Sequence, residues 1–265
     1  MASTSTANPE PPAAPSGPAE VTEIHTHILR LALGIEESRA YWANVDPTVP
    51  LATRPVFAFE NRWFGAKSLE RVRTLLGNFV LRYDAYPEGL AVLRRWRNMD
   101  PNTRQVICHW HLQLCDPIYR RFTGTFLVER RDSSNLPIGR STVLRWVDGE
   151  YPGKWAAATK VQFASKLLSA ASEAGLLSMK RDPRTLLFPK VTPLALGYWF
   201  YFLRGVRFGG TLVENPYLAS VGLVGGILDQ ALRSLPGITY RHMAGLHDFD
   251  FDAPSLAAWA ERTLT

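Results

Sequence analysis

The segment over residues 68–83 carries the most regular apolar spacing in the chain, and this spacing constrains the fold more than any other feature. Apolar or aromatic residues occupy positions 69, 72, 75, 76, 79, 80 and 83. Intervals of three and four residues bring these side chains to one face of an α-helix, which must then be buried against other elements. Ser68 stands directly before them and is a favoured N-cap residue.

Similar patterns further along indicate a helical bundle. Pro87 and Pro101 each suit a first helical turn, and apolar residues at helical spacing follow both. We expect the second of these helices to extend to Phe122. The predicted fold class is all-α, mainly a helical bundle, and this bundle is expected to span residues 22–132.

The composition indicates a globular chain with a polar start. Of the 265 residues, 46% are hydrophobic and 20% are charged, which is ordinary for a globular protein. Residues 1–21 are rich in Pro and Ala, so we expect a disordered tail. The most apolar run, residues 194–203, is about half as long as a membrane-spanning helix and is better explained as a buried helix. Because the chain has only 2 Cys residues, we expect a cytoplasmic protein, and because its apolar runs are short, we expect no membrane contact.

The positive charge is concentrated in the middle of the chain. Residues 1–61 carry a net charge of −4, residues 62–190 a net charge of +11, and residues 191–265 a net charge of −1, within a total of +6. Attraction to a polyanion grows with the number of phosphates that a protein contacts. The local excess therefore favours an anionic partner such as nucleic acid.

Residues 133–192 show the order of elements typical of a winged helix-turn-helix. A short helix is expected over residues 141–147, followed by a turn with two Gly and one Pro, and then a long helix from Lys154 or Trp155 to Ala174. Two apolar runs around a basic, Pro-containing turn then predict a β-hairpin within residues 177–188. In such an arrangement the second helix enters the major groove of DNA and the hairpin lies against the backbone.

Basic and polar side chains of this segment are the candidate DNA-binding residues, and a basic face of the bundle is the second candidate. Lys160 falls within the apolar stripe of its helix, so it either projects past the core toward a phosphate or extends into solvent. For the other basic residues the alternative is a solvated face without a ligand. The candidates are Arg145, Lys154, Thr159, Lys160, Gln162, Lys166, Lys180, Arg181 and Arg184, together with Arg71, Arg73 and Arg82 on the bundle.

Two groups of possible metal ligands are weaker candidates. Cys108, His111 and Cys115 would share a helical face, but sulfurs about 10 Å apart along the axis cannot both reach one zinc ion. Residues 247–252 alternate acidic and aromatic residues within a C-terminal segment, 193–265, that we otherwise expect to be helical. As a strand they could hold a cation, yet a solvated edge with core-facing Phe residues is the better interpretation. We expect no metal and no cofactor.

The chain also lacks the catalytic motifs that a sequence can reveal. It contains no phosphate-binding glycine loop ending in GK[ST], and no GxSxG, HExxH or SxxK motif. We therefore expect a protein without catalytic activity.

Several pieces of the sequence resemble the BrxA family of BREX phage-defence systems. They are Glu37-Ser38, the pattern LxxVxxLLxxFVLRY in residues 69–83, the hexapeptide STVLRW at 141–146, Thr159-Lys160, and LSAASEAGLL at 168–177. The resemblance covers roughly residues 22–265 and leaves out the Pro/Ala-rich start.

This resemblance implies a small, non-enzymatic helical protein whose N-terminal part is similar to the NusB antitermination factors. It implies binding to double-stranded DNA and joint action with a methyltransferase and a phosphatase-like protein in host methylation and phage exclusion. Two alternatives stay open. One is a protein–protein scaffold that uses Trp, Tyr and Arg as interface anchors, and the other is an RNA-binding protein.

Overall fold

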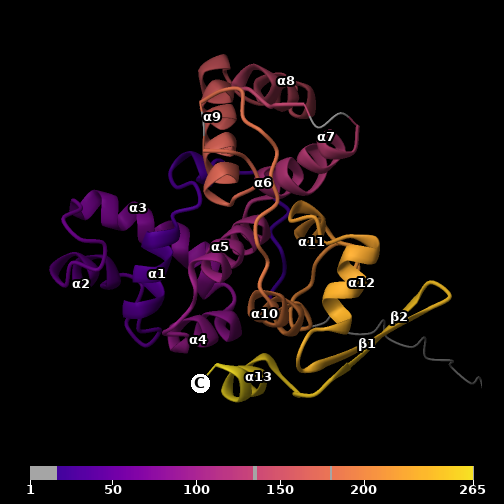
Figure 1. Cartoon of the computed structure of the whole chain (residues 1–265). Coiled ribbons are helices and arrows are strands. Elements are labelled where there is room, and N and C mark those ends of the chain that lie inside the picture. Colours follow the sequence, from indigo (N-terminus) through magenta and orange to yellow (C-terminus); the bar gives the residue numbers. More distant parts are fainter. Residues whose placement is uncertain (1–16, 134–135, 180, 265) are drawn as a thin grey trace, which may run out of the picture.

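The computed structural model describes residues 17–133, 136–179 and 181–264. Within these ranges the chain is mostly helical, as expected, and contains a two-stranded antiparallel sheet, whose strands lie within residues 238–251 and not within the predicted 177–188 (Figure 1). The elements are α1 (Ile35–Asn44), α2 (Arg54–Glu60), α3 (Leu69–Phe79), α4 (Pro87–Arg95), α5 (Pro101–Cys115), α6 (Pro117–Arg121), α7 (Leu127–Ser133), α8 (Arg140–Glu150), α9 (Ala157–Glu173), α10 (Pro193–Leu203), α11 (Pro216–Ser220), α12 (Gly225–Arg233), β1 (Ile238–Met243), β2 (Leu246–Phe251) and α13 (Leu256–Thr263). Short η elements are the 3-10 turn η1 (His27–Leu29) and the π-helical turns η2 (Val80–Asp84) and η3 (Phe122–Phe126).

Helices α5 and α10 pack together at the centre of the molecule (Figure 1). All residues from 106 to 115 are buried on α5, and all residues from 195 to 203 are buried on α10. The rings of Trp110 and Trp199 stack between the two helices with their centroids 4.9 Å apart. The apolar run at 194–203 is therefore a core helix, as expected. None of the helices in the described part of the chain is long and apolar enough to cross a membrane.

The amphipathic helix at 68–83 forms as expected, but it changes its winding before its end. The Ser68 hydroxyl accepts a hydrogen bond from the backbone N–H of Arg71 at 3.3 Å, which confirms the N-cap. Val72, Leu75 and Phe79 are buried against the core. After Phe79 the chain continues as the π-helical turn η2, which carries the extra residue per turn typical of such turns.

The helix expected to extend to Phe122 is interrupted after Cys115. Asp116 has an extended backbone, and its carboxylate accepts from the N–H of Tyr119 at 2.8 Å, so it caps a new helix, α6. Pro117 lies at the first position of α6, where its missing N–H costs nothing. The Asp-Pro pair is the sequence signal for this break.

The prediction of a disordered tail over residues 1–21 is wrong for residues 17–21. Residues 1–16 lie outside the described ranges, but residues 17–21 are hydrogen-bonded to the bundle. The N–H of Glu20 donates to Arg207 O at 2.9 Å, and the N–H of Val21 donates to Leu114 O at 2.8 Å. These residues belong to the folded domain because their backbone groups pair with it.

The C-terminal segment 193–265 was expected to be helical, but part of it forms a sheet. Strands β1 and β2 form an antiparallel hairpin within it, in which Ile238 pairs with Phe251 and His242 with His247. Phe249 and Phe251 pack on aromatic residues of α10, while Asp248 and Asp250 face solvent. This alternation of core and solvent positions favours the solvated-edge interpretation of residues 247–252.

Candidate nucleic-acid interface

The pair α8–α9 projects from the body of the molecule, at the top in Figure 1. The two helices pack against each other, with Val143 and Val147 of α8 and Phe163, Ala164 and Leu167 of α9 all buried. A turn over residues 151–156 joins them. Gly153 in this turn has a φ of +71°, a conformation that favours glycine.

The chain after α9 folds back along it. Gly175 ends the helix with a φ of +74°, the left-handed conformation expected of a C-terminal glycine. Leu177 then forms an antiparallel bridge with Leu186, and Ile138 forms another with Arg184. These bridges join three short extended pieces beside α9, but they are too short to form strands. The β-hairpin predicted at 177–188 is thus present only as isolated antiparallel bridges.

One face of α9 is left open to solvent. Its exposed residues are Ala158, Val161 and Gln162. Ser165, one turn after Val161, is half-buried at the edge of the same face. These side chains are small or uncharged, so another molecule can approach the helix backbone closely. Lys154 lies in the turn before this face, and the half-buried Lys166 follows Ser165 at its other end.

Six of the predicted DNA-binding residues reach the surface of this lobe. Lys154, however, lies in the turn and not on the helix, because α9 begins two or three residues later than the predicted start at Lys154 or Trp155, with Ala156 as the N-cap. Its amine lies 5.8 Å from the ring centroid of Trp155. The six residues are Arg145 on α8, Lys154 in the turn, Thr159, Gln162 and Lys166 on α9, and Arg181 after it.

Three other predicted residues have partners inside the protein or lie outside the described ranges. The amine of Lys160 forms an ion pair with Asp148 of α8, so it ties the two helices together and does not point away from them. Arg184 donates to the carbonyl oxygen of Leu168 at 3.0 Å. Lys180 lies outside the described residues.

The second basic face, around Arg71, Arg73 and Arg82, does not exist as predicted. Arg82 is only 1% exposed, and it donates to the carbonyl oxygens of Leu33 at 2.6 Å and Ala32 at 3.0 Å. Arg71 donates to the carbonyl oxygen of Arg30 at 3.0 Å, and Arg73, the one exposed arginine of the three, lies 3.6 Å from the carboxylate of Glu70. The sequence periodicity failed here because the π-helical turn η2 rotates residue 82 toward the core.

A basic pocket lies instead between α1, the end of α4 and the start of α5. It has a volume of about 390 Å³ and is lined by Arg39, Arg94, Arg97, Arg104, Trp42 and Trp96, among others. Glu36 pairs with both Arg39 and Arg104, at 2.8 and 3.1 Å, so one carboxylate neutralises part of the charge of these two arginines. The dense run of Arg residues at 94–97 was the sequence signal for this pocket.

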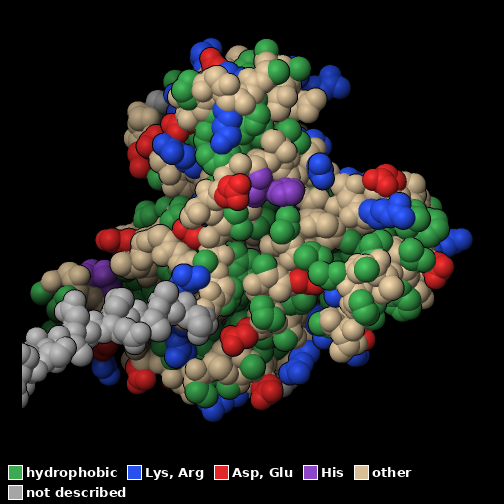
Figure 2. Space-filling model, turned by 180° about the vertical axis from the view of Figure 1, so that it is seen from behind, with side chains coloured by type: hydrophobic (Ala, Val, Ile, Leu, Met, Phe, Trp, Pro, Cys, Tyr) green, Lys and Arg blue, Asp and Glu red, His purple; other side chains and the backbone are tan. Residues whose placement is uncertain are grey.

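On the face opposite to that of Figure 1, the basic side chains do not form one continuous patch. Seen from behind, Lys and Arg side chains lie in separate groups interleaved with Asp and Glu (Figure 2). The excess of +11 in the middle segment is therefore shared between partners inside the protein, the α8–α9 lobe and the arginine pocket.

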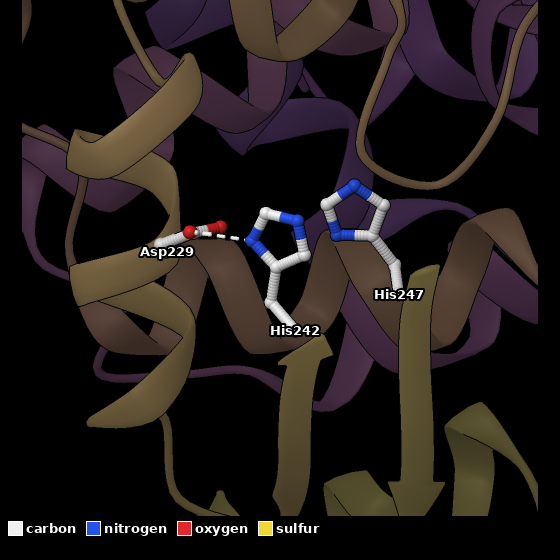
Figure 3. Close-up of side chains that lie close together, drawn as sticks. All are labelled: Asp229, His242 and His247. Carbon is white, nitrogen blue, oxygen red and sulfur yellow. Dashed lines mark hydrogen bonds and ion pairs between the residues drawn. The ribbon is translucent and has the colours of Figure 1, made fainter. Parts of the chain in front are cut away.

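A further cluster, which the sequence analysis missed, lies on the C-terminal hairpin. Asp229, His242 and His247 each offer one ligand atom within 4.8 Å of the others (Figure 3). Hydrogen bonds from Tyr240 and His242 lower the pKa of Asp229, so its carboxylate is ionised at neutral pH. Two His residues on either side of Gly245, a residue that readily adopts the positive φ of a tight hairpin turn, were the available signal.

Comparison with known proteins adds information on the fold only. No family model matches the chain, and no curated protein matches it. The crystal structure of an uncharacterized protein from Magnetospirillum magneticum is similar, with a TM-score of 0.52 and 16% sequence identity, over 69% of this chain and 93% of that one. The fold is thus shared with a solved protein.

Proposed function

We propose that this protein binds double-stranded DNA through α8, α9 and residues 176–187, which together act as a winged helix-turn-helix. The exposed face of α9 carries the proposal, because small and uncharged side chains there are bordered by two lysines. In a helix-turn-helix the second helix lies in the major groove, while basic residues beside it contact phosphates.

The individual side chains suit separate roles in this interface. Gln162 is an exposed amide on the face of α9, and amides of this kind can form two hydrogen bonds with adenine in the major groove. We propose that Lys154 and Lys166 contact phosphates on either side of this face. Arg145 and Arg181 are exposed at the edges of the lobe and extend the same positive surface.

The test is a titration of duplex DNA of random sequence at several salt concentrations, with two charge-matched double variants. Lys154→Glu with Lys166→Glu should weaken binding at every salt concentration. It should also reduce the slope of log affinity against log salt by about 2, since each phosphate contact contributes about 0.9. Lys160 is left unchanged because its ion pair with Asp148 links α8 to α9.

The control is Arg94→Glu with Arg97→Glu in the arginine pocket, which removes the same charge from a different surface. This variant should keep the wild-type affinity and slope. If only the pocket variant loses binding, the interface lies at the pocket, and if neither variant changes binding, the proposal is wrong. Competition with double-stranded and single-stranded RNA separates the RNA-binding alternative.

The wider setting is also a proposal and rests on the resemblance alone. It comprises a cytoplasmic, non-enzymatic role in a BREX phage-defence system, with a NusB-like N-terminal part and with a methyltransferase and a phosphatase-like protein as partners. Co-purification of those two proteins after nuclease treatment tests it. Partners that survive nuclease while the protein itself binds no nucleic acid would favour the scaffold alternative.

A further inference from the structure

Three side chains from separate parts of the C-terminal segment converge on one point of the surface. Asp229 comes from α12, His242 from β1 and His247 from β2 (Figure 3). One ligand atom of each lies within 4.8 Å of the other two. Two imidazoles and a carboxylate form a ligand set that binds zinc and related divalent transition metals in proteins.

The hairpin holds the two imidazoles side by side. His242 and His247 are directly paired across the strands, so their side chains leave the same face of the sheet. Ala244 and Gly245 make the turn between the strands, and both have positive φ values, of 49° and 79°. The two rings stack with centroids 4.2 Å apart and an angle of 22° between their planes.

Tyr240 and Asp229 fix the orientation of these rings. The Tyr240 hydroxyl lies 2.6 Å from Oδ1 of Asp229 and 2.8 Å from Nδ1 of His247. The other carboxylate oxygen of Asp229, Oδ2, lies 2.8 Å from Nδ1 of His242. The Tyr240 hydroxyl, which contacts Asp229 and His247 but is not itself one of the three ligands, is a partner of the kind that is typical around metal-binding histidines.

The spacing is compatible with one ion. Ligand atoms at about 2.0–2.1 Å from a tetrahedral zinc ion are about 3.3 Å from each other. The nitrogen–oxygen contact of 2.8 Å between His242 and Asp229 is close to this value. Both His residues are exposed, so a small rotation of His247 can bring in the third ligand, and water can occupy the fourth position.

We propose that Asp229, His242 and His247 form a site for a divalent transition metal, with zinc as the representative ion. Such an ion would join the turn end of the β1–β2 hairpin to the middle of α12. This inference is independent of DNA binding, since the cluster lies on the hairpin and not on the α8–α9 lobe (Figure 1).

The test is calorimetric titration of zinc into the full, untagged chain after treatment with a chelator. The wild-type protein should bind one zinc ion per chain, and binding at this site should be lost in His242→Ala and in His247→Ala. Tyr240→Phe keeps the three ligands but removes the hydroxyl that orients them, so it should weaken binding by about 10-fold. Cobalt(II) in place of zinc gives a visible absorption spectrum that reports the coordination.

The matched control is Asp248→Asn, which removes an exposed carboxylate of β2 next to His247. It should bind zinc as the wild type does. A His242→Gln variant, with circular dichroism on every variant, separates loss of a ligand from loss of the hairpin. The proposal is wrong if the wild type takes up no zinc at about 100 µM, well above the affinity range of ordinary protein zinc sites. It is equally wrong if uptake persists in both His→Ala variants, since the zinc would then be held elsewhere on the protein.

Discussion

Replacing Arg82 with Met should destabilise the protein strongly, because this arginine serves the core and not a surface. Methionine keeps most of the length of the side chain but has no hydrogen-bond donor. The carbonyl oxygens of Leu33 and Ala32 would lose their donors, which lie at 2.6 and 3.0 Å. An unsatisfied buried polar group costs about 1–3 kcal/mol, so we expect the free energy of unfolding to fall by about 4 kcal/mol.

Thermal and urea unfolding followed by circular dichroism measure this effect. For a chain of this size, about 4 kcal/mol corresponds to a melting temperature lower by about 8–16 °C. The control is Arg73→Met on the exposed side of α3, which should change the stability by less than about 0.5 kcal/mol. At a temperature where Arg82→Met is folded, its DNA affinity should match the wild type. Loss of DNA binding with unchanged stability would refute the reasoning, because Arg82 would then contribute to DNA binding and not to the core.

Three further predictions concern stability. Burial lowers the pKa of His109 and of His111 from 6.5 to about 3, so below pH 6.5 only the unfolded chain binds these protons. The stability that they contribute is complete above pH 6.5 and is lost as the pH falls, by up to about 4 kcal/mol between pH 7 and pH 5 in urea unfolding; equal stability at both values would contradict this. Gly124→Ala would place a Cβ 2.5 Å from a proline side chain of α11 and should lower the free energy of unfolding by about 1–3 kcal/mol, whereas Gly149→Ala on the open side of α8 should raise it by about 0.5–1 kcal/mol. Asp100→Ala removes the N-cap of α5, whose carboxylate accepts from two backbone N–H groups, and should cost about 1 kcal/mol by the same measurement.

The helices could be predicted where apolar spacing and end signals agree. Around α3, helical periodicity and the cap at Ser68 indicate the same boundary, and the structure has it. In α10 the apolar run is continuous, so burial could be predicted although no face could be assigned. Pro117 shows the opposite case, because periodicity continues through it while its ring and missing N–H favour a new helix start.

The candidate surface residues could be predicted less well, because a charged side chain does not reveal its partner. Lys160 broke the apolar pattern of its helix, and this anomaly was informative, but Asp148, its partner, stands on another helix. His242 and His247 meet only through the register of a hairpin that the sequence analysis did not predict. Contacts of this kind depend on tertiary arrangement, which the local sequence does not specify.

The distribution of arginine changes what the net charge of the middle segment means for binding. Guanidinium groups that donate to backbone carbonyls, as those of Arg82 and Arg184 do, are held inside the protein by the groups that they satisfy. Releasing them toward a phosphate would leave those carbonyls without partners, so they contribute little to the salt dependence of binding. The charge that is available to a DNA interface is therefore that of the basic side chains that do not donate hydrogen bonds to backbone carbonyls. In the α8–α9 lobe these include Lys154 and Lys166, which is why two substitutions there should have more effect than the net charge of +11 would suggest.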